Sequence, residues 1–375
     1  MITFKSSKAL TVGVELELQL VNKRNYDLTR ASVDFMEIVK KRKLIYDIKP
    51  EVTESMIEIA SKPYANILDL ENELNLINRE VISIASILNI GISGGGTHPF
   101  QNWTERQIFP AERYTAVSDI YGYLTKQFNV YGQHVHIGCE DGDIAIELIQ
   151  YLSQFIPHFI ALGSSSPFNQ AEDTLFQSSR LTSISSFPLS GIIPDLSSWK
   201  EFEIYFSAMK DTGIVSTIKD FYWDIRPQPD YGTIEIRICD SPLTIYRACI
   251  IAAYIQMLSS YFLKNYKLLK RAKIDRYTYS YNKFQAARYG FDGIIVRNFK
   301  KPIKISISQD IENNLELLIG HSFALNTHHY HKKLSEIVKN KNSNSNQIKK
   351  IYKQKGNFPG LVESLCDIWK SNSYI

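Results

Sequence analysis

The stretch Thr11–Leu20 alternates apolar and polar residues with a period of two, which predicts a β-strand. Successive side chains of a strand point to opposite faces, so the apolar residues are expected to line a core while Glu15 and Glu17 share the other face. Two carboxylates at that spacing repel each other. A cation held between them is one interpretation, and a solvated sheet face is the other.

The composition is that of an ordinary globular protein, with 44% hydrophobic and 22% charged residues in a chain of 375. The net charge of +4 is too small to indicate a nucleic-acid-binding protein. The four cysteines lack CxxC spacing, which predicts reduced thiols rather than a zinc knuckle or a disulfide framework. The first ten residues lack the apolar segment of a signal peptide, and the longest apolar run, Ala248–Leu258, falls short of the ~20 residues of a membrane span. We therefore expect a cytoplasmic protein with no membrane partner, and a homodimer as the usual state of such an enzyme.

Apolar spacing of three and four residues predicts helices, most clearly over Asn66–Leu88. Further helices are expected over Ser32–Lys43, Ile144–Leu162, Ile245–Leu269 and Asp310–Lys339. Loops are predicted over Ser178–Ser198 and Tyr289–Pro302, and a polar connector over Asn340–Asn346. Nothing in the sequence resembles a linker, so residues 1–375 are expected to form one domain with a helical C-terminal part from about residue 245.

About six strands are predicted, and most of them alternate rather than being uniformly apolar. After the first, they cover Glu51–Ala60, Asn89–Phe100, Phe128–Gly138, Phe221–Pro227 and Thr233–Asp240. This pattern favours an α+β fold with an antiparallel sheet that has one polar face, and helices on the other face.

The polar faces of these strands together carry carboxylates, histidines and arginines: Glu15, Glu17, Glu54, Glu58, His134, His136, Asp224, Arg226, Glu235 and Arg237. Oxygen-rich ligand sets suit hard cations such as Mg²⁺, which often also coordinates phosphate oxygens. Arginines among the acids are suited to bind phosphate or a substrate carboxylate. His134 has an alternative role as a hydrogen-bonded core residue, and His321, His328, His329 and His331 are expected on the surface.

Six motifs in this order resemble the bacterial carboxylate-amine ligases of the YbdK type, relatives of glutamate-cysteine ligase. They are Gly13–Glu17, Thr53–Glu58, Gly94–Pro99, His134–Gly138, Trp223–Pro227 and Gly232–Arg237. The resemblance extends to Phe284–Gly290, where the family usually has tryptophan in place of Phe284. It departs from the family over Asn340–Lys350, which is rich in Asn and Ser where the family tends to have a small-residue segment containing Arg and Gln.

The resemblance implies a cup-shaped, six-stranded antiparallel sheet flanked by helices, in the glutamine-synthetase-like superfamily, with ATP and Mg²⁺ in the cup. By motif, the implied metal ligands are Glu15, Glu17, Glu54, Glu58, His136 and Glu235. Arg237 and Arg226 are implied to hold the transferring phosphate, with His136 beside the cofactor and Glu54 among the catalytic residues.

The implied activity is ATP- and Mg²⁺-dependent formation of an amide through an acyl phosphate. The expected carboxylate is the γ-carboxylate of glutamate, and the default amine is L-cysteine, with weak glutamate-cysteine ligase activity. Such chemistry needs charge neutralisation and alignment rather than a protein nucleophile. Two alternatives stay open. A zinc amidohydrolase would use His134-x-His136 but would have parallel strands alternating with helices, and a non-catalytic nucleotide-binding regulator would lack a site ligand.

Overall fold

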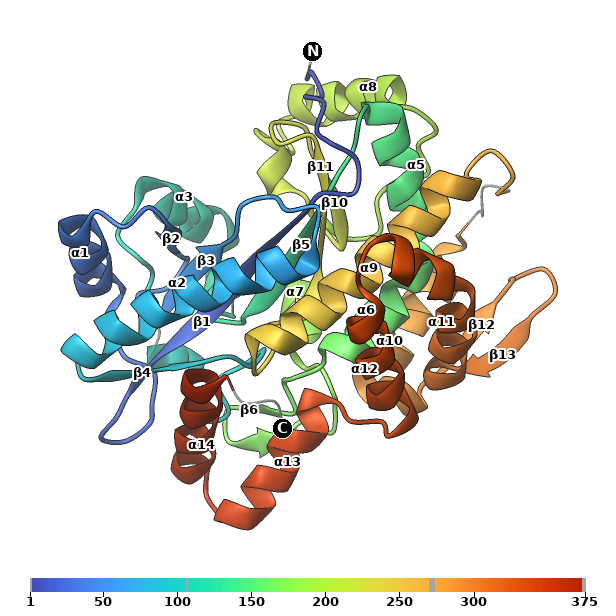
Figure 1. Ribbon diagram of the computed structural model, residues 1–375. Coiled ribbons are helices and arrows are strands. Elements are labelled where there is room, and N and C mark those ends of the chain that lie inside the picture. Colours follow the sequence, from blue (N-terminus) through green and yellow to red (C-terminus); the bar gives the residue numbers. More distant parts are fainter. Residues whose placement is uncertain (1, 106, 128, 270–273, 373–375) are drawn as a thin grey trace.

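The computed structural model describes residues 2–105, 107–127, 129–269 and 274–372. Its main sheet has seven antiparallel strands, one more than the sequence predicts. Six of them follow the order β10 (Ile225–Gln228), β11 (Thr233–Asp240), β5 (Gly132–Gly138), β1 (Val12–Asn22), β3 (Met56–Ala60) and β2 (Asp47–Pro50). The seventh, β4 (Ile90–Ser93), pairs with the C-terminal half of β1. Helices pack against this sheet to give an α+β fold (Figure 1).

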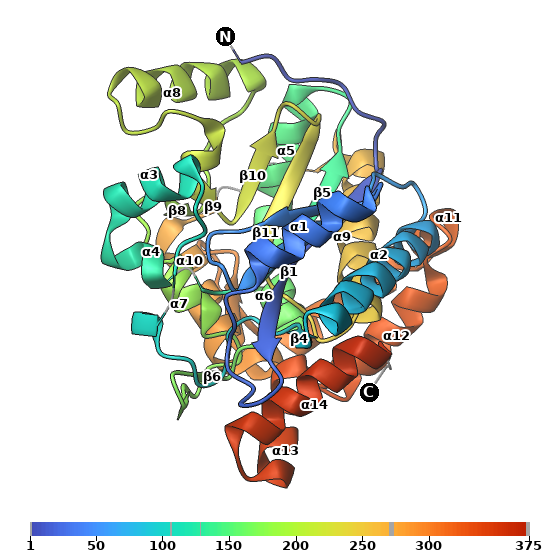
Figure 2. The same ribbon diagram turned by 90° about the vertical axis from the view of Figure 1, so that its left-hand side faces the viewer.

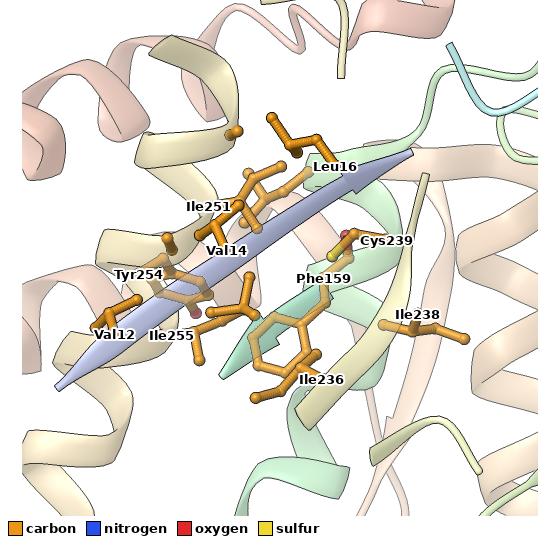
Figure 3. Close-up of a cluster of buried hydrophobic side chains, with 14 of the residues drawn as sticks. Val12, Val14, Leu16, Phe159, Ile236, Ile238, Cys239, Ile251, Tyr254 and Ile255 are labelled. Carbon is orange, nitrogen blue, oxygen red and sulfur yellow. The ribbon is translucent and has the colours of Figure 1, made fainter. Parts of the chain in front are cut away.

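The central strand β1 has the predicted alternation. Val14 and Leu16 are at most 1% exposed, and Figure 3 shows them beside Ile251 and Tyr254 of helix α9 (Ile245–Asn265). Burial of this apolar face contributes about 25 cal/mol per Å² of surface removed from water. A slip of one residue would turn these side chains to the polar face, so core packing fixes the register and with it the position of every polar residue on β1.

Four helices cover the apolar face of the sheet (Figures 1 and 2). They are α2 (Ile67–Ile87), α5 (Gly142–Leu152), α6 (Ile156–Gly163) and α9. Helix α2 lies where the sequence predicts it, and the Asn66 side chain caps it by accepting a hydrogen bond from the N–H of Leu68. Among the described residues, Gly142–Gly163 is the one helical stretch with the length and hydropathy of a membrane span. Since 78% of its most apolar window is buried in the fold, it is weak evidence for a membrane protein.

The strand predicted over Glu51–Ala60 is correct only from Met56. Residues 51–55 instead form the turn between β2 and β3, and the short edge strand β2 has no alternation that would have revealed it. The predicted loop Ser178–Ser198 is wrong in part, because it contains α7 (Arg180–Ile184) and β8 (Ser190–Gly191). The remaining α-helices and strands before α9 are α1 (Ser32–Arg42), α3 (Glu112–Tyr121), α4 (Tyr123–Gln127), β6 (Phe168–Asn169), β7 (Glu172–Asp173), α8 (Trp199–Asp211) and β9 (Tyr222–Trp223).

Beyond α9, the described residues of the C-terminal part are helical apart from one hairpin. Its elements are α10 (Arg276–Tyr289), β12 (Ile294–Arg297), β13 (Ile303–Ser306), α11 (Ile307–Ala324), α12 (His328–Lys339), α13 (Asn344–Lys355) and α14 (Phe358–Ser371). The predicted loop Tyr289–Pro302 is therefore wrong where β12 pairs with β13, and the predicted helix Asp310–Lys339 is divided into α11 and α12.

The predicted polar connector Asn340–Asn346 is also wrong at its end, where Asn344 begins helix α13. Asn344 and Ser345 are buried. The Asn344 side chain accepts a hydrogen bond from the N–H of Leu243, and the N–H of Ser345 donates to the carbonyl of Ser164. These polar residues join the C-terminal helices to the segments around the sheet, which explains why they occur inside the fold.

Candidate active site

The polar face of the sheet lines a cavity of about 320 Å³, here called the sheet cavity. Antiparallel pairing brings its residues together from distant parts of the sequence: Glu15 on β1 lies opposite His134 on β5, and Glu17 lies opposite Glu58 on β3. Glu235 on β11 lies opposite His136 on β5. The sheet therefore brings together five of the six residues that the resemblance implied as metal ligands: Glu15, Glu17, Glu58, His136 and Glu235.

His134 occupies the centre of this cluster, although the sequence left it with a core role as an alternative. Its Nδ1 lies 3.0 Å from Glu15 Oε2 and 3.6 Å from Glu235 Oε1, and its Nε2 lies 3.7 Å from Glu17 Oε1. Burial and the nearby Arg237 guanidinium lower the pKa of His134 to about 4. The imidazole is therefore neutral near pH 7 and keeps one nitrogen available as an acceptor or a metal ligand.

His136 has a buried ring nitrogen without a hydrogen bond. Its Nδ1 is 3.0 Å from Thr233 Oγ1, whereas Nε2 faces Glu15 Oε1 at 3.4 Å without hydrogen-bond geometry. Buried polar atoms are normally satisfied, so an unpaired nitrogen aimed at a carboxylate calls for a missing partner. A cation between the two atoms would supply it.

Two overlapping groups of side chains have the geometry of a metal site. Glu15, His136 and Glu235 form one, and Glu15, Glu58 and His134 form the other. Within each group the ligand atoms lie within 4.8 Å of one another. Sets dominated by carboxylate oxygen suit Mg²⁺ or Mn²⁺ better than zinc, so these residues fit the implied divalent ion.

The carboxylates of the sheet cavity lie close to one another, and this shifts their pKa values. Burial and the neighbouring carboxylates of Glu15 and Glu51 hold the pKa of Glu58 well above its usual range. Burial raises the pKa of Glu17 to about 8, against the opposing effect of Arg180. Burial would also raise the pKa of Glu15, but the hydrogen bond with His134 and the charge of the nearby His136 outweigh it and place that pKa well below its usual range. Such crowding of carboxylates is typical of a functional site and would be relieved by a divalent cation.

Two arginines converge on Glu235, which is 1% exposed. Arg226 donates from Nε (3.2 Å) and Nη2 (2.9 Å) to Glu235 Oε2, and Arg237 donates to Oε1. Burial would raise the pKa of Glu235, but the two guanidinium groups more than offset it and keep the group ionised. Arg226 also donates through Nη1 to the carbonyls of Lys219 and Phe221, so most of its five N–H groups are already used.

Glu54 is not among the residues that line the sheet cavity. It lies in the turn before β3, where its carbonyl accepts hydrogen bonds from the N–H groups of Ala31 and Ser32 at the start of α1. Its separation from Glu58 by four residues suggested a shared face, but that argument fails because the strand begins only at Met56. Glu51, in the same turn, lines the cavity instead.

Five further charged residues of the cavity were missed by sequence reasoning: Lys49, Glu51, Arg113, Arg180 and Lys219. Lys49 lies opposite Glu58 on the edge strand β2, with its ammonium 3.8 Å from Glu58 Oε1. Arg180 is 4% exposed and reaches the cavity from α7, with no hydrogen bond to its Nε. The signal that could have indicated Arg180 is Gly132, because a Cβ at that position would overlap the Arg180 guanidinium.

The sheet excludes one predicted alternative. The zinc amidohydrolase interpretation requires parallel strands alternating with helices, whereas the strands that carry His134 and His136 belong to an antiparallel sheet. The site is also dominated by carboxylates rather than by the nitrogen and sulfur ligands that zinc favours.

Comparison with known proteins agrees with this architecture. The model of the glutamate-cysteine ligase family 2 (GCS2) matches residues 11–366. A putative glutamate-cysteine ligase 2 of Janthinobacterium sp. (strain Marseille) is 47% identical over 98% of this chain and 99% of its own length. One of Herminiimonas arsenicoxydans is 48% identical over 98% of this chain and 99% of its own length.

Solved structures with low sequence identity share the fold. A glutamate-cysteine ligase from Francisella tularensis in complex with AMP matches with a TM-score of 0.70 and 12% identity, over 98% of this chain and 89% of that chain. A bifunctional glutathione synthetase from Pasteurella multocida matches with a TM-score of 0.71 and 14% identity, over 96% of this chain and 52% of that chain. Since the family model and the relatives at 47% and 48% identity cover nearly the whole chain, the protein is a ligase that belongs to glutamate-cysteine ligase family 2.

Proposed function

We propose that this ligase uses ATP and Mg²⁺ to join the γ-carboxylate of glutamate to an amine, with L-cysteine as the default acceptor. The observation that carries the proposal is the sheet cavity itself, whose lining combines six acidic residues and His134 with four arginines. His136 lies beside this lining, with its Nε2 3.4 Å from Glu15 Oε1. Acids that gather divalent cations beside arginines that neutralise a transferred phosphoryl group are what this reaction needs. The cup-shaped description of the sheet belongs to the same proposal, as do a single catalytic domain, a cytoplasmic location and a homodimer.

The first half-reaction forms an acyl phosphate. A carboxylate oxygen of glutamate attacks the γ-phosphorus of ATP, the bond to the bridging oxygen breaks, and ADP leaves with the electron pair. Bound Mg²⁺ would neutralise charge on the phosphate oxygens. Glu15, Glu58, His134, His136 and Glu235 are the residues proposed to hold it.

The arginines have separate parts in this proposal. Arg237, whose side chain is 23% exposed and borders the cavity, is proposed to contact the transferred phosphoryl group. Arg226, whose side chain is 6% exposed and largely satisfied by protein acceptors, is proposed to orient Glu235 and thereby Arg237. The sequence implied a phosphate contact for both.

The second half-reaction forms the amide. The uncharged amine attacks the acyl carbon, the bond from that carbon to the phosphate oxygen breaks, and the proton lost by nitrogen leaves on hydrogen phosphate. No step requires a protein nucleophile, which fits a cavity lined by charge rather than by a reactive Ser or Cys.

The experiment is to incubate the enzyme with ATP, Mg²⁺, glutamate and hydroxylamine and to measure ADP and glutamyl hydroxamate. Hydroxylamine is a small nucleophile that intercepts an acyl phosphate without needing a shaped acceptor site. We expect hydroxamate formation that requires both Mg²⁺ and glutamate, and that Glu15→Gln and Glu235→Gln abolish. Activity that survives both substitutions would contradict the proposed roles.

A further inference from the structure

A second cavity adjoins the sheet cavity and is not used by the chemistry described so far. It measures about 960 Å³ and lies between the α7–β8 segment and helix α10. Leu181 and Trp223 line both cavities, so the two share a wall. We call it the α10 cavity.

An ion pair spans the boundary between the two cavities. Asp224 lines the sheet cavity, whereas its partners Lys283 and Tyr279 line the α10 cavity. Lys283 Nζ lies 2.7 Å and 2.9 Å from the two carboxylate oxygens of Asp224, and the Tyr279 hydroxyl donates to Oδ2 at 2.6 Å. Asp224 is 2% exposed, so this buried pair joins α10 to the residue that follows Trp223. A ligand in the α10 cavity would therefore lie directly beside the acyl phosphate site.

Apolar side chains form more than half of the lining of the α10 cavity, and they include six aromatic rings: Phe176, Phe187, Tyr205, Trp223, Tyr279 and Phe284. Phe284 is 48% exposed yet packs edge-on against Phe176 at a centroid distance of 5.9 Å. The polar part of the lining consists of five small hydroxyl residues, Gln150 and three charged residues: Thr182, Ser185, Ser186, Ser190, Ser280, Gln150, Asp195, Arg276 and Lys283. A mostly apolar lining around a cavity of this size favours a ligand with an apolar or aromatic body over a small polar one.

We propose that the α10 cavity binds the amine acceptor, and that primary amines with a bulky apolar or aromatic body are better acceptors than the default, L-cysteine. The proposal rests on the ligase function proposed above, because it names the substrate class of the same reaction. The amine nitrogen reaches the acyl carbon past the Trp223 wall, displaces phosphate from that carbon, and loses its proton to hydrogen phosphate. The apolar body stays among the rings of the α10 cavity.

The test compares acceptors in one assay and keeps hydroxylamine as the reference. We would measure kcat/KM for 2-phenylethylamine and L-phenylalanine against methylamine and L-cysteine, with amides identified by mass spectrometry. The bulky amines are expected to exceed the small ones by about tenfold or more, since each buried methylene is worth about 10-fold or more in such pockets. Equal or lower values for both bulky amines would overturn the proposal. Absence of glutamyl hydroxamate would instead reject the ligase function itself.

Two substitutions on α10 localise the effect. Ser280→Trp places a large ring in the cavity, and we expect it to lower the ratio of bulky-amide to hydroxamate formation by about tenfold. Tyr277→Trp is the matched control, because Tyr277 lies on the same helix, is 85% exposed and is not among the cavity residues. An unchanged ratio in Ser280→Trp would overturn the proposal. So would an increase in KM for ATP in the hydroxylamine reaction, which would assign the cavity to the nucleotide base.

Discussion

Arg226 donates two hydrogen bonds to a single oxygen of Glu235, Oε2, from Nε at 3.2 Å and from Nη2 at 2.9 Å. The pair lies on neighbouring strands, where Arg226 is directly opposite Glu235. Each residue is at most 5% exposed, so neither charge is screened by solvent to any extent. This pair connects the hairpin β10–β11 to the acids of the sheet cavity and orients the carboxylate that also binds Arg237.

We expect Arg226→Lys to lower kcat for hydroxamate formation by about 100-fold. Lysine keeps the charge but cannot make the two-donor contact, so Glu235 and Arg237 lose their fixed geometry. The poorer contact should also lower the free energy of unfolding, by less than the about 3 kcal/mol that complete removal of one partner from a buried pair costs. The measurements are steady-state kinetics and urea unfolding, with Arg79→Lys on the exposed side of α2 as the matched control. A kcat close to that of the native enzyme would show that the pair does not support the reaction.

Glu51 and Glu54 lie in the same turn but differ in position, and this difference is testable. Glu51 lines the sheet cavity, where burial raises its pKa against the opposing charge of Arg113. Glu51→Gln is expected to weaken Mg²⁺-dependent activity by about 10-fold or more, as loss of a residue that supports metal ligands does. Glu54→Gln is expected to change it by about 2-fold at most, which is within the effect of an ordinary surface substitution. A larger loss in Glu54→Gln than in Glu51→Gln would reverse the placement.

The contrast between these two glutamates also marks where sequence reasoning succeeds. The acids of β1 and β11 could be predicted because apolar and polar residues alternate along a strand with one buried face, and this alternation is visible in the sequence. Glu54 was misplaced because a spacing of four residues puts two side chains on the same face of both a helix and a strand, but not of a turn. The edge strand β2, with Lys49, has only four residues and carries no pattern at all.

Arg180 could not be predicted for a different reason. Its place in the site depends on a tertiary contact between a five-residue helix and the start of β5, and such contacts leave no local signal. The same holds for Asn344 and Ser345, whose polar character indicates solvent but whose hydrogen bonds are made inside the fold. The polarity of a residue predicts whether it is exposed only when the fold offers it no buried hydrogen-bond partner.

A buried network outside the site predicts acid sensitivity. His158 is buried and binds Tyr254 OH through Nδ1 (2.8 Å) and Asp310 Oδ2 through Nε2 (2.7 Å). Burial lowers the pKa of His158, against the effect of Asp310. Burial would raise the pKa of Asp310, but His158 and Arg297 reverse that shift and lower it.

Both shifts have the same sign for stability. In the unfolded chain His158 has a pKa of about 6.5, whereas its pKa in the folded protein is lower. Below about pH 6.5 the unfolded chain therefore binds a proton that the folded protein does not, and the free energy of unfolding falls. Asp310 adds a further loss below about pH 4. We expect His158→Gln to reduce the slope of unfolding free energy against pH between about pH 6.5 and 5 by up to about 1.4 kcal/mol per pH unit. The exposed His328 gives the control substitution His328→Gln, and an unaltered slope in His158→Gln would refute the argument.

A substitution at Gly132 tests whether the position of the Arg180 guanidinium matters for activity. The N–H of Gly132 donates to Glu17 Oε2, and a Cβ at this position would overlap the guanidinium of Arg180. Since the overlapping atoms are the far end of a flexible side chain, we expect Gly132→Ala to fold normally but to displace Arg180 from Glu17.

Displacement of a charged group by about 1 Å can cost up to about 100-fold in rate, so we expect a large fall in kcat with little change in melting temperature. Gly320→Ala is the matched control, because a Cβ at Gly320 on α11 meets no atom within 4 Å. Removal of a glycine from the middle of this helix should stabilise the protein by about 0.5–1 kcal/mol and leave the rate unchanged. If Gly132→Ala retained full activity, Arg180 would have no part in orienting the acids of the sheet cavity, and Glu17 would depend on the β5 backbone alone.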